Sequence, residues 1–278
     1  MAGVVSLIAF GLKPGIDFTS GSLTELRFKH PYDSAKVRQA LTEVQVGEFQ
    51  LQTTDNNGLI IRTKRIDSSK HQEILDRLKT QVGEFDEIRF EFIDPVIGKE
   101  LTGNSIKQLI LVSAGIVLYI AYAFRRVSRP VTAWRFGWAA IIALLHDLLV
   151  VLGIFSLLGH FKGVEVDSMF VTAMLTVLGF SVHDTIVVFD RIRENLKVYA
   201  GQSLEFIINH SISQTLVRSL NTSLTVLFVL LALLLFGGDT IKYFVLALFI
   251  GIITGTYSSI FVASPILVLW QRLRAKRA

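Results

Sequence analysis

Four apolar runs follow residue 105, and each is long enough to cross a lipid bilayer. They cover roughly 106–124, 134–159, 166–190 and 219–270. A run of about 18 or more apolar residues predicts a transmembrane helix, because a helix rises ~1.5 Å per residue and the hydrocarbon core is ~30 Å thick. The break at Gly237-Gly238-Asp239 divides the last run into 219–236 and 242–270. We therefore expect a polytopic α-helical membrane protein with five complete spans in 106–278.

The first residues, MAGVVSLIAFGL, are apolar but cover only twelve positions. At ~1.5 Å per residue they reach about 18 Å, which is short of the ~30 Å core. We expect 1–14 to be the outer end of a truncated first transmembrane helix, or a re-entrant segment. A cleaved signal peptide is the alternative, and the lack of a basic n-region and of a small-residue cleavage site argues against it.

Positive charges are divided unevenly between the two sides of the predicted spans. Twelve lie on one side, namely Arg125, Arg126, Arg129, Arg135, Arg191, Arg193, Lys197, Arg218, Arg272, Arg274, Lys276 and Arg277. The loops on the other side hold only Lys162 and Lys242. Since cytoplasmic loops carry the excess of lysine and arginine, we expect a cytoplasmic C-terminus and an extracytoplasmic segment 15–105. This pattern accounts for the net charge of +5 without nucleic acid, and an RNA-binding tail in the last eight residues is the alternative.

Residues 15–105 have the pattern of a small folded domain outside the membrane. Residues 24–30, 48–54, 59–64 and 87–93 alternate like strands, and a hairpin signal follows the second. Asp33 and Asp67 precede amphipathic helical stretches that end near Val44 and Val82. The order β-α-β-β-α-β is that of the ferredoxin-like fold, and we expect the segment from Asp94 to Asn104 to link the domain to the membrane.

The sequence shows no catalytic or metal-binding constellation. His30 and His71 are isolated, no nucleophile lies near a base, and no phosphate-binding glycine loop is present. We expect both histidines to be ordinary surface residues, and we predict no enzymatic activity, no cofactor and no metal. The absence of cysteine means that no disulfide staples the domain.

Two aspartates, Asp147 and Asp184, lie inside predicted spans. A carboxylate in hydrocarbon is costly unless it is paired, hydrated or protonated, so such residues usually serve ion or proton movement. Apolar neighbours of Asp184 favour its neutral form, and Arg218, which opens the next span, favours its charged form. We expect Asp184 and Arg218 to belong to a proton pathway. A buried ion pair that joins two helices is the alternative.

Other polar residues of the predicted spans also carry predictions. Asp147 is predicted either to relay protons or to form a structural hydrogen bond with a serine or threonine of another helix. His146 is not expected to bond to it, because adjacent helical residues point about 100° apart. His183 is expected to be a packed polar residue. Asn221, Thr222 and Thr225, with Ser223, could hydrogen-bond Asp184 or hold water, or act as polar contacts between helices.

Two further patterns concern packing. Gly251, Gly255 and Ser259 recur every four residues, followed by Ala263, and this stripe of small residues lets another helix of this chain or of a partner approach closely. Residues 203–217 have apolar positions on one side and are expected to form an amphipathic helix on the inner membrane surface.

Several motifs resemble the SecF branch of the bacterial SecD/SecF family. They are Gly15-Ile16-Asp17-Phe18-Thr19, the long motif from Asp184 through Asp190 and Arg191 to Glu194, Arg218 to Ser223, and Gly255 to Ser259. The resemblance covers nearly the whole chain. Two departures are the pair Ser20-Gly21, where the family usually has two glycines, and the short first helix.

The resemblance implies a subunit of the inner membrane that pairs with a SecD-like chain in a bundle of the resistance–nodulation–division type. It implies work beside the SecYEG channel on unfolded preproteins, powered by the proton-motive force, with Asp184 and Arg218 in proton movement. Two alternatives stay open, an exporter component for drugs or lipids and a passive scaffold of the translocon.

Overall fold

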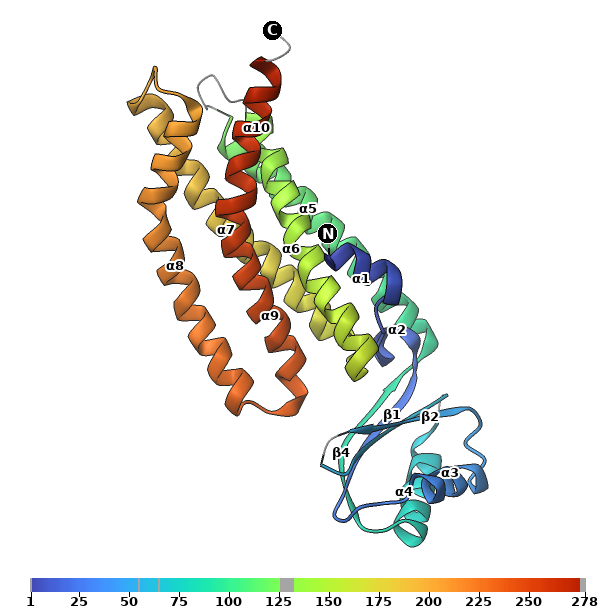
Figure 1. Ribbon diagram of the computed structural model, residues 1–278. Coiled ribbons are helices and arrows are strands. Elements are labelled where there is room, and N and C mark those ends of the chain that lie inside the picture. Colours follow the sequence, from blue (N-terminus) through green and yellow to red (C-terminus); the bar gives the residue numbers. More distant parts are fainter. Residues whose placement is uncertain (1, 55, 65, 126–132, 276–278) are drawn as a thin grey trace. The chain divides into compact units, whose positions relative to one another are not determined.

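The computed structural model describes residues 2–54, 56–64, 66–125 and 133–275 (Figure 1). The chain forms two compact units. The sheet unit comprises Pro14–Asn104, and the helical unit comprises Met1–Lys13 together with Ser105–Ala278.

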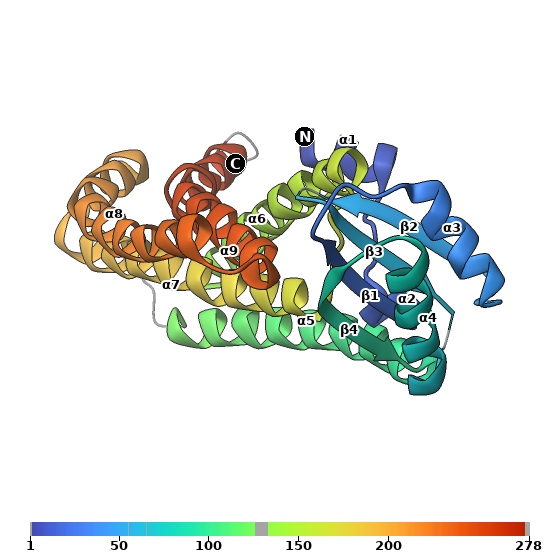
Figure 2. The ribbon, with the colours of Figure 1, turned by 90° about the horizontal axis from the view of Figure 1, so that it is seen from below.

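The sheet unit contains a four-stranded antiparallel sheet, two longer helices and one short helix. Its elements are α2 (Ile16–Thr19), β1 (Gly21–Phe28), α3 (Ser34–Glu43), β2 (Phe49–Thr54), β3 (Gly58–Thr63), α4 (Ser68–Gln81) and β4 (Phe85–Ile93). The strand order β2-β3-β1-β4 is that of a ferredoxin-like fold, which confirms the predicted fold class. Helices α3 and α4 cover one face of the sheet (Figure 2). The core lies between them and that face, where Leu26, Leu59, Leu41 and Leu78 are fully buried.

Helices α3 and α4 begin where the sequence predicts. The carboxylate of Asp33 accepts the backbone N–H of Ala35, and that of Asp67 accepts the N–H of Lys70, each at 2.8 Å. These contacts satisfy donors that the first turn of a helix leaves free. The prediction for His71 is wrong, because its side chain is buried, contacts Glu87 at 2.9 Å and stacks on the ring of Phe90.

The pair Ser20-Gly21 lies between α2 and β1 with positive φ at both positions. Gly21 has φ +117°, and an added Cβ would lie 2.6 Å from the carbonyl oxygen of Thr63. Ser20 has φ 65° and ψ 167°, a conformation that glycine adopts far more easily than serine. This geometry explains why two glycines suit the motif, and it predicts local strain at Ser20.

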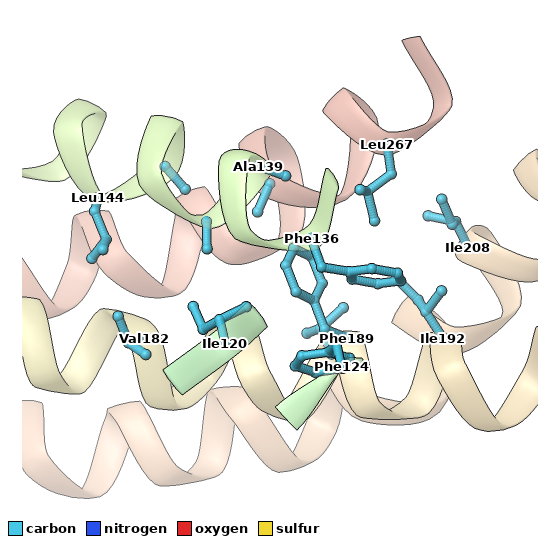
Figure 3. Close-up of a cluster of buried hydrophobic side chains, with 14 of the residues drawn as sticks. Ile120, Phe124, Phe136, Ala139, Leu144, Val182, Phe189, Ile192, Ile208 and Leu267 are labelled. Atoms are coloured by element: carbon cyan, nitrogen blue, oxygen red, sulfur yellow. The ribbon is translucent and has the colours of Figure 1, made fainter. Parts of the chain in front are cut away.

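The helical unit contains five helices long and apolar enough to cross a membrane, counted over the residues that the structure describes. Its elements are α1 (Ala2–Phe10), α5 (Pro95–Ala123, which starts before the unit), α6 (Ala133–Lys162), α7 (Ser168–Val198), α8 (Leu204–Phe236), α9 (Asp239–Ser258), the π-helix η1 (Ser259–Ala263) and α10 (Ser264–Ala275). An aromatic cluster joins α5, α6 and α7. Phe124, directly after α5, stacks on Phe136 of α6, and Phe189 of α7 meets both rings edge-on (Figure 3).

Two segments differ from the sequence prediction. The expected linker from Asp94 to Asn104 is helical, because the carboxylate of Asp94 caps the N–H of Val96 and Pro95 suits the first helical position. The expected amphipathic surface helix at 203–217 is not a separate element but the first half of α8. Its apolar residues Leu204, Ile207 and Ile208 are buried in the core of the helical unit rather than turned toward a membrane surface.

The last predicted span contains a π-helix that the sequence analysis did not foresee. Pro265 has no N–H to donate to the carbonyl one turn back, and its ring crowds that carbonyl. The preceding turn widens over Ser259–Ala263, and the hydroxyl of Ser264 donates to the carbonyl of Ser259 at 3.0 Å. Local π geometry of this kind lets a proline stay within a membrane helix.

Helix α1 packs closely on α6 through small residues. A Cβ on Gly153 would lie 2.3 Å from the Cα of Gly3, so the two backbones touch. Ser6 donates to the carbonyl of Gly153 at 2.9 Å, and Ser156 donates to the carbonyl of Ser6 at 3.0 Å. The nine residues of α1 are thus held to α6 by hydrogen bonds as well as by apolar contact.

Candidate functional site

Asp147 lies in the middle of the helical unit and is completely buried. Its Oδ2 atom accepts the hydroxyl of Ser181 on α7 at 2.6 Å and the hydroxyl of Ser258 at the end of α9 at 2.7 Å. The predicted hydrogen bond to a serine of another helix is therefore confirmed, and two helices supply one. This carboxyl joins α6, α7 and α9 in a site that excludes solvent.

His146 contacts the same carboxyl, contrary to the sequence prediction. Its Nδ1 atom lies 3.1 Å from Oδ1 of Asp147. The two side chains diverge around the helix, but Nδ1 is close to the backbone and can still reach the short aspartate. The imidazole is partly exposed and lies near the ring of Tyr257, so one edge of the buried acid reaches the outer face of the bundle.

Asp184 lies on α7, three residues beyond Ser181, and only 2% of it is exposed. The hydroxyls that face its carboxyl belong to Thr256 of α9 and to Ser219 and Ser223 of α8. Among the described residues, Oδ2 of Asp184 and the hydroxyl of Ser219 have no hydrogen bond of good geometry. Ser223 and Thr256 bond to each other at 2.6 Å. The acid is thus surrounded by hydroxyls of two other helices rather than by a cation.

The surroundings of both acids depend on α7 and α9. Ser181 and Asp184 are one turn apart on α7, while Thr256 and Ser258 are neighbours on α9. A hydroxyl both donates and accepts, so each of these groups suits a carboxylate and a carboxylic acid alike. Any displacement of α9 along or away from α7 therefore changes the surroundings of both acids at once. The π-helix begins directly after Ser258, and such bulges often lie at functional sites.

Glycines bring α9 close enough to α7 for these contacts. A Cβ on Gly251 would lie 2.2 Å from Cγ2 of Val177, and a Cβ on Gly255 would lie 2.9 Å from the Cβ of Ser181. The predicted stripe of small residues therefore packs against a helix of this chain. Ser259 is also fully buried, and its hydroxyl donates to the carbonyl of Thr256.

The polar residues predicted at the start of the α8 span lie on its other side. Arg218, Asn221, Thr222 and Thr225 are exposed in this chain, whereas Ser219 and Ser223 face Asp184. The hydroxyl of Thr222 donates to the carbonyl of Arg218, and that of Thr225 to the carbonyl of Thr222. No ion pair between Arg218 and Asp184 occurs among the described side chains. His183 is likewise exposed rather than packed.

The remaining motif residues are not among the contacts of either acid. Gly15, Asp17 and Phe18 belong to the turn and short helix α2 of the sheet unit, where Gly15 is the N-cap. Asp190 pairs with Arg193 at 2.6 Å, and Arg191 pairs with Glu194 at 2.8 Å, at the end of α7. The two ion pairs at the end of α7 form a charged rim, which does not continue the buried polar site.

A metal site is not evident in the described part of the chain, where no three ionisable ligands gather. Four residues that supply contacts of the two acids were not predicted from the sequence, namely Ser181, Ser219, Thr256 and Ser258. Their only sequence signal is that hydroxyl residues lie within apolar spans, one or two turns from an acid or within the stripe of small residues. Serine is common in membrane helices as a small packing residue, so that signal alone does not identify partners.

Comparison with known proteins places these features in one family. Residues 73–273 match the family described as "Protein export membrane protein SecD/SecF, C-terminal", and residues 5–31 match "SecD/SecF GG Motif". A "Protein translocase subunit SecF" of Thermobaculum terrenum is 50% identical, with 97% of this chain and 88% of the relative covered. One of Anaerolinea thermophila is 41% identical over the same shares.

A solved structure has the same fold over nearly the whole chain. The crystal structure of SecDF from Thermus thermophilus, described as a translocon-associated membrane protein, matches with a TM-score of 0.83 and 34% identity. The match covers 97% of this chain but 36% of that chain. A crystal structure of SecDF in a super-membrane-facing form matches with a TM-score of 0.69 and 34% identity.

Proposed function

The chain belongs to the SecD/SecF family of protein-export membrane proteins, and on that premise we propose that it is the SecF-type subunit of a translocase that couples proton movement to protein export. Its relatives carry the name "Protein translocase subunit SecF", and the chain corresponds to about a third of the SecDF chain it resembles. A SecD-like chain would supply the other half of the bundle. The complex would act on unfolded preproteins beside the SecYEG channel.

The observation that carries the proton-coupling proposal is the environment of Asp184. A carboxyl that is 98% buried in a membrane helix, with one oxygen lacking a hydrogen bond of good geometry, is costly as a carboxylate. It is tolerated as the neutral acid, and the hydroxyls of Ser219, Ser223 and Thr256 can accept its proton or donate to its anion. This arrangement therefore favours the neutral acid, and loss of the proton favours a rearrangement around it.

The structure changes the mechanism that the sequence suggested. Arg218 does not pair with Asp184 in this arrangement, and its side chain is exposed. We propose that the neutral acid corresponds to this state. Deprotonation creates a buried charge, which attracts the guanidinium of Arg218, one residue from Ser219, and shifts α8 against α7. Ser223 of α8 bonds to Thr256 of α9, so a shift of α8 would also move α9. The hydrogen bond from Ser258 of α9 to Asp147 would then change as well.

The proposed orientation follows the charge distribution. The charged end of α7, with Arg191, Arg193 and Lys197, would face the cytoplasm together with the C-terminus. The sheet unit would then lie on the outer face of the cell membrane, where exported polypeptides emerge. A movement of the membrane helices would reach that unit through α5, which runs continuously from Pro95 to Ala123.

The test is the substitution Asp184→Asn in the assembled complex in membrane vesicles. It should abolish the part of preprotein export that depends on the proton gradient, while expression and assembly with the SecD-like chain are unchanged. Asp167→Asn is the matched control, because it makes the same change at the N-cap of the same helix and asparagine caps as well as aspartate.

Full proton-dependent export by the Asp184→Asn variant would remove the coupling mechanism. It would leave the passive scaffold as the better description. Proton uptake by vesicles, with and without the substitution, separates the same two possibilities by a second readout.

A further inference from the structure

Two polar side chains lie side by side on the outer surface of the helical unit. They are His146 of α6, whose side chain is 37% exposed, and Tyr257 of α9, which is 53% exposed. Their ring centroids are 6.4 Å apart. Among the described residues, the only hydrogen-bond partner of these two side chains is Asp147, which contacts Nδ1 of His146. Within that part of the chain, Nε2 of His146 and the hydroxyl of Tyr257 therefore have no partner.

Both groups lie at the depth of the middle of the membrane. His146 is near the centre of the 29-residue span Trp134–Lys162, and Tyr257 is near the centre of the 34-residue span Thr240–Leu273. At ~1.5 Å per residue, each lies about 18–26 Å from the ends of its span, more than the ~15 Å half-thickness of the hydrocarbon core. Lipid tails cannot form hydrogen bonds, and histidines in membrane helices almost always face protein or a water-filled cavity. A surface that faced lipid would leave both groups unpaired at high cost.

The rest of this surface is apolar. Ile142 lies one turn before His146, Ile253 and Phe261 lie one turn to either side of Tyr257, and all three apolar residues are exposed. The ring of Phe261 stacks on that of Tyr257 at 4.9 Å. We call these five residues the His146 patch. A buried water makes about three hydrogen bonds, whereas the patch offers one free ring nitrogen and one hydroxyl among apolar side chains. The patch therefore suits a helix surface better than a water-filled path.

The surroundings of Asp147 determine the role of Nε2 of His146. Oδ2 of this buried carboxyl accepts the hydroxyls of Ser181 and Ser258, and Oδ1 faces Nδ1 of His146. A net charge is costly at this depth, and the pair is neutral in two arrangements. Either an imidazolium donates from Nδ1 to the carboxylate, or the carboxylic acid donates from Oδ1 to Nδ1 of a neutral imidazole. Nε2 carries a hydrogen in both arrangements, so it needs an acceptor that the described part of the chain does not supply.

We propose that a transmembrane helix of a second membrane chain packs on the His146 patch and places a hydrogen-bond acceptor at Nε2 of His146. A carboxylate, a side-chain amide oxygen or a hydroxyl oxygen has the required chemistry. Such a bond connects the partner helix, through the imidazole, with Asp147 and hence with α7 and α9. This inference rests on the proposed function, because the SecD-like chain is the expected source of the helix. The present chain covers only 36% of the SecDF chain that it resembles.

Site-specific photocrosslinking tests which molecule covers the His146 patch. A photoreactive phenylalanine analogue replaces Ile253 in the full chain, in complex with the SecD-like chain in membrane vesicles. The matched control carries the analogue in place of Leu118 of α5, which is also an exposed apolar residue within a membrane span. We expect strong crosslinking to the SecD-like chain from residue 253 and weak crosslinking from residue 118.

Two substitutions of His146 test the hydrogen bond itself. The side-chain amide of asparagine reaches about the position of Nδ1, and that of glutamine reaches about the position of Nε2. His146→Asn should therefore keep the contact with Asp147 and lose the donor to the partner, and His146→Gln should do the reverse. We expect His146→Asn to weaken binding of the SecD-like chain in detergent about threefold to twentyfold, as for the loss of one hydrogen bond between membrane helices, with unchanged thermal stability of the separate chain. His146→Gln should lower the stability of the separate chain and keep that affinity.

Crosslinks from residue 253 only to lipid or to a second copy of this chain, or no crosslinks at all, would overturn the proposal. So would equally strong crosslinks to the SecD-like chain from residue 118, because the contact would then not be specific to the patch. An affinity that follows the stability of the separate chain in both variants would show that His146 acts only within its own chain, and the proposal would fail. If any of these results accompanies normal proton-dependent export, which Asp184→Asn abolishes, the proposed function stands and the docking site alone fails.

Discussion

The close contact between α7 and α9 leads to a quantitative prediction for Gly255→Ala. The new Cβ would lie 2.9 Å from the Cβ of Ser181 and 3.2 Å from its Cα. Carbon atoms in contact prefer about 3.5–4.0 Å, so the two helices must separate by several tenths of an ångström at this point. Ser181 donates to Asp147 from this position, and Ser258 donates from the next turn of α9, so both hydrogen bonds of 2.6 and 2.7 Å lengthen.

The expected cost can be isolated with a second glycine. Overpacking of a tight contact costs about 1–3 kcal/mol, whereas alanine in place of glycine favours a helix by about 0.8–1.0 kcal/mol. Gly179→Ala on α7 has the same propensity gain, and its Cβ would meet no atom within 4 Å. The propensity terms cancel between the two variants, so Gly255→Ala should be about 1–3 kcal/mol less stable than Gly179→Ala.

The measurement is reversible unfolding of both variants in the same detergent, followed by proton-dependent export in vesicles. Gly255→Ala should lower both stability and proton-dependent export, and Gly179→Ala should lower neither. If the two variants are equally stable and equally active, α9 does not need its close approach to α7. The argument that this contact positions the hydroxyls of both acids would then be refuted.

Three further predictions concern particular contacts. Ser181→Ala and Ser258→Ala should each lower the free energy of unfolding by about 0.5–1.7 kcal/mol. A double-mutant cycle should show coupling because both hydroxyls bind one oxygen of Asp147, and purely additive effects would contradict the shared site. Ser20→Gly should raise thermal stability, because relief of a backbone conformation that costs about 1–3 kcal/mol outweighs the entropy cost of glycine, about 0.5–1 kcal/mol. A lower midpoint of thermal unfolding would show that Ser20 is unstrained. The N–H of Lys70 and then the hydroxyl of Ser69 hold the pKa of Asp67 below its ordinary value of 3.8, so the stability that Asp67 gives α4 is present above that pH and is lost as pH falls through the lower folded-state pKa. Asp67→Asn should keep the helix cap at neutral pH and remove this acid-sensitive stability from thermal midpoints measured over a pH series, whereas an unchanged pH profile would exclude the role.

Much of the architecture follows from patterns within single segments. Apolar runs of sufficient length predict membrane helices whatever their neighbours, and strand alternation with capping aspartates predicts the β-α-β-β-α-β order. Segment ends were less predictable. The start of α5 at Pro95 and the fusion of 203–217 into α8 depend on how those residues pack against the rest of their units, which the local pattern does not contain.

The sequence alone requires that two carboxyl groups lie in membrane helices, because Asp147 and Asp184 interrupt long apolar runs. It did not determine what surrounds them. A side chain's partners come from helices distant in the chain, and a rotation of α8 by one residue, about 100°, decides whether Ser219 or Arg218 faces Asp184. Only the tertiary structure shows that the hydroxyl faces inward, that Ser181 and Ser258 share Asp147, and that a π-helix follows them. The physical reason is that hydrophobicity is a property of one segment, whereas a hydrogen bond between helices depends on the rotation and spacing of both.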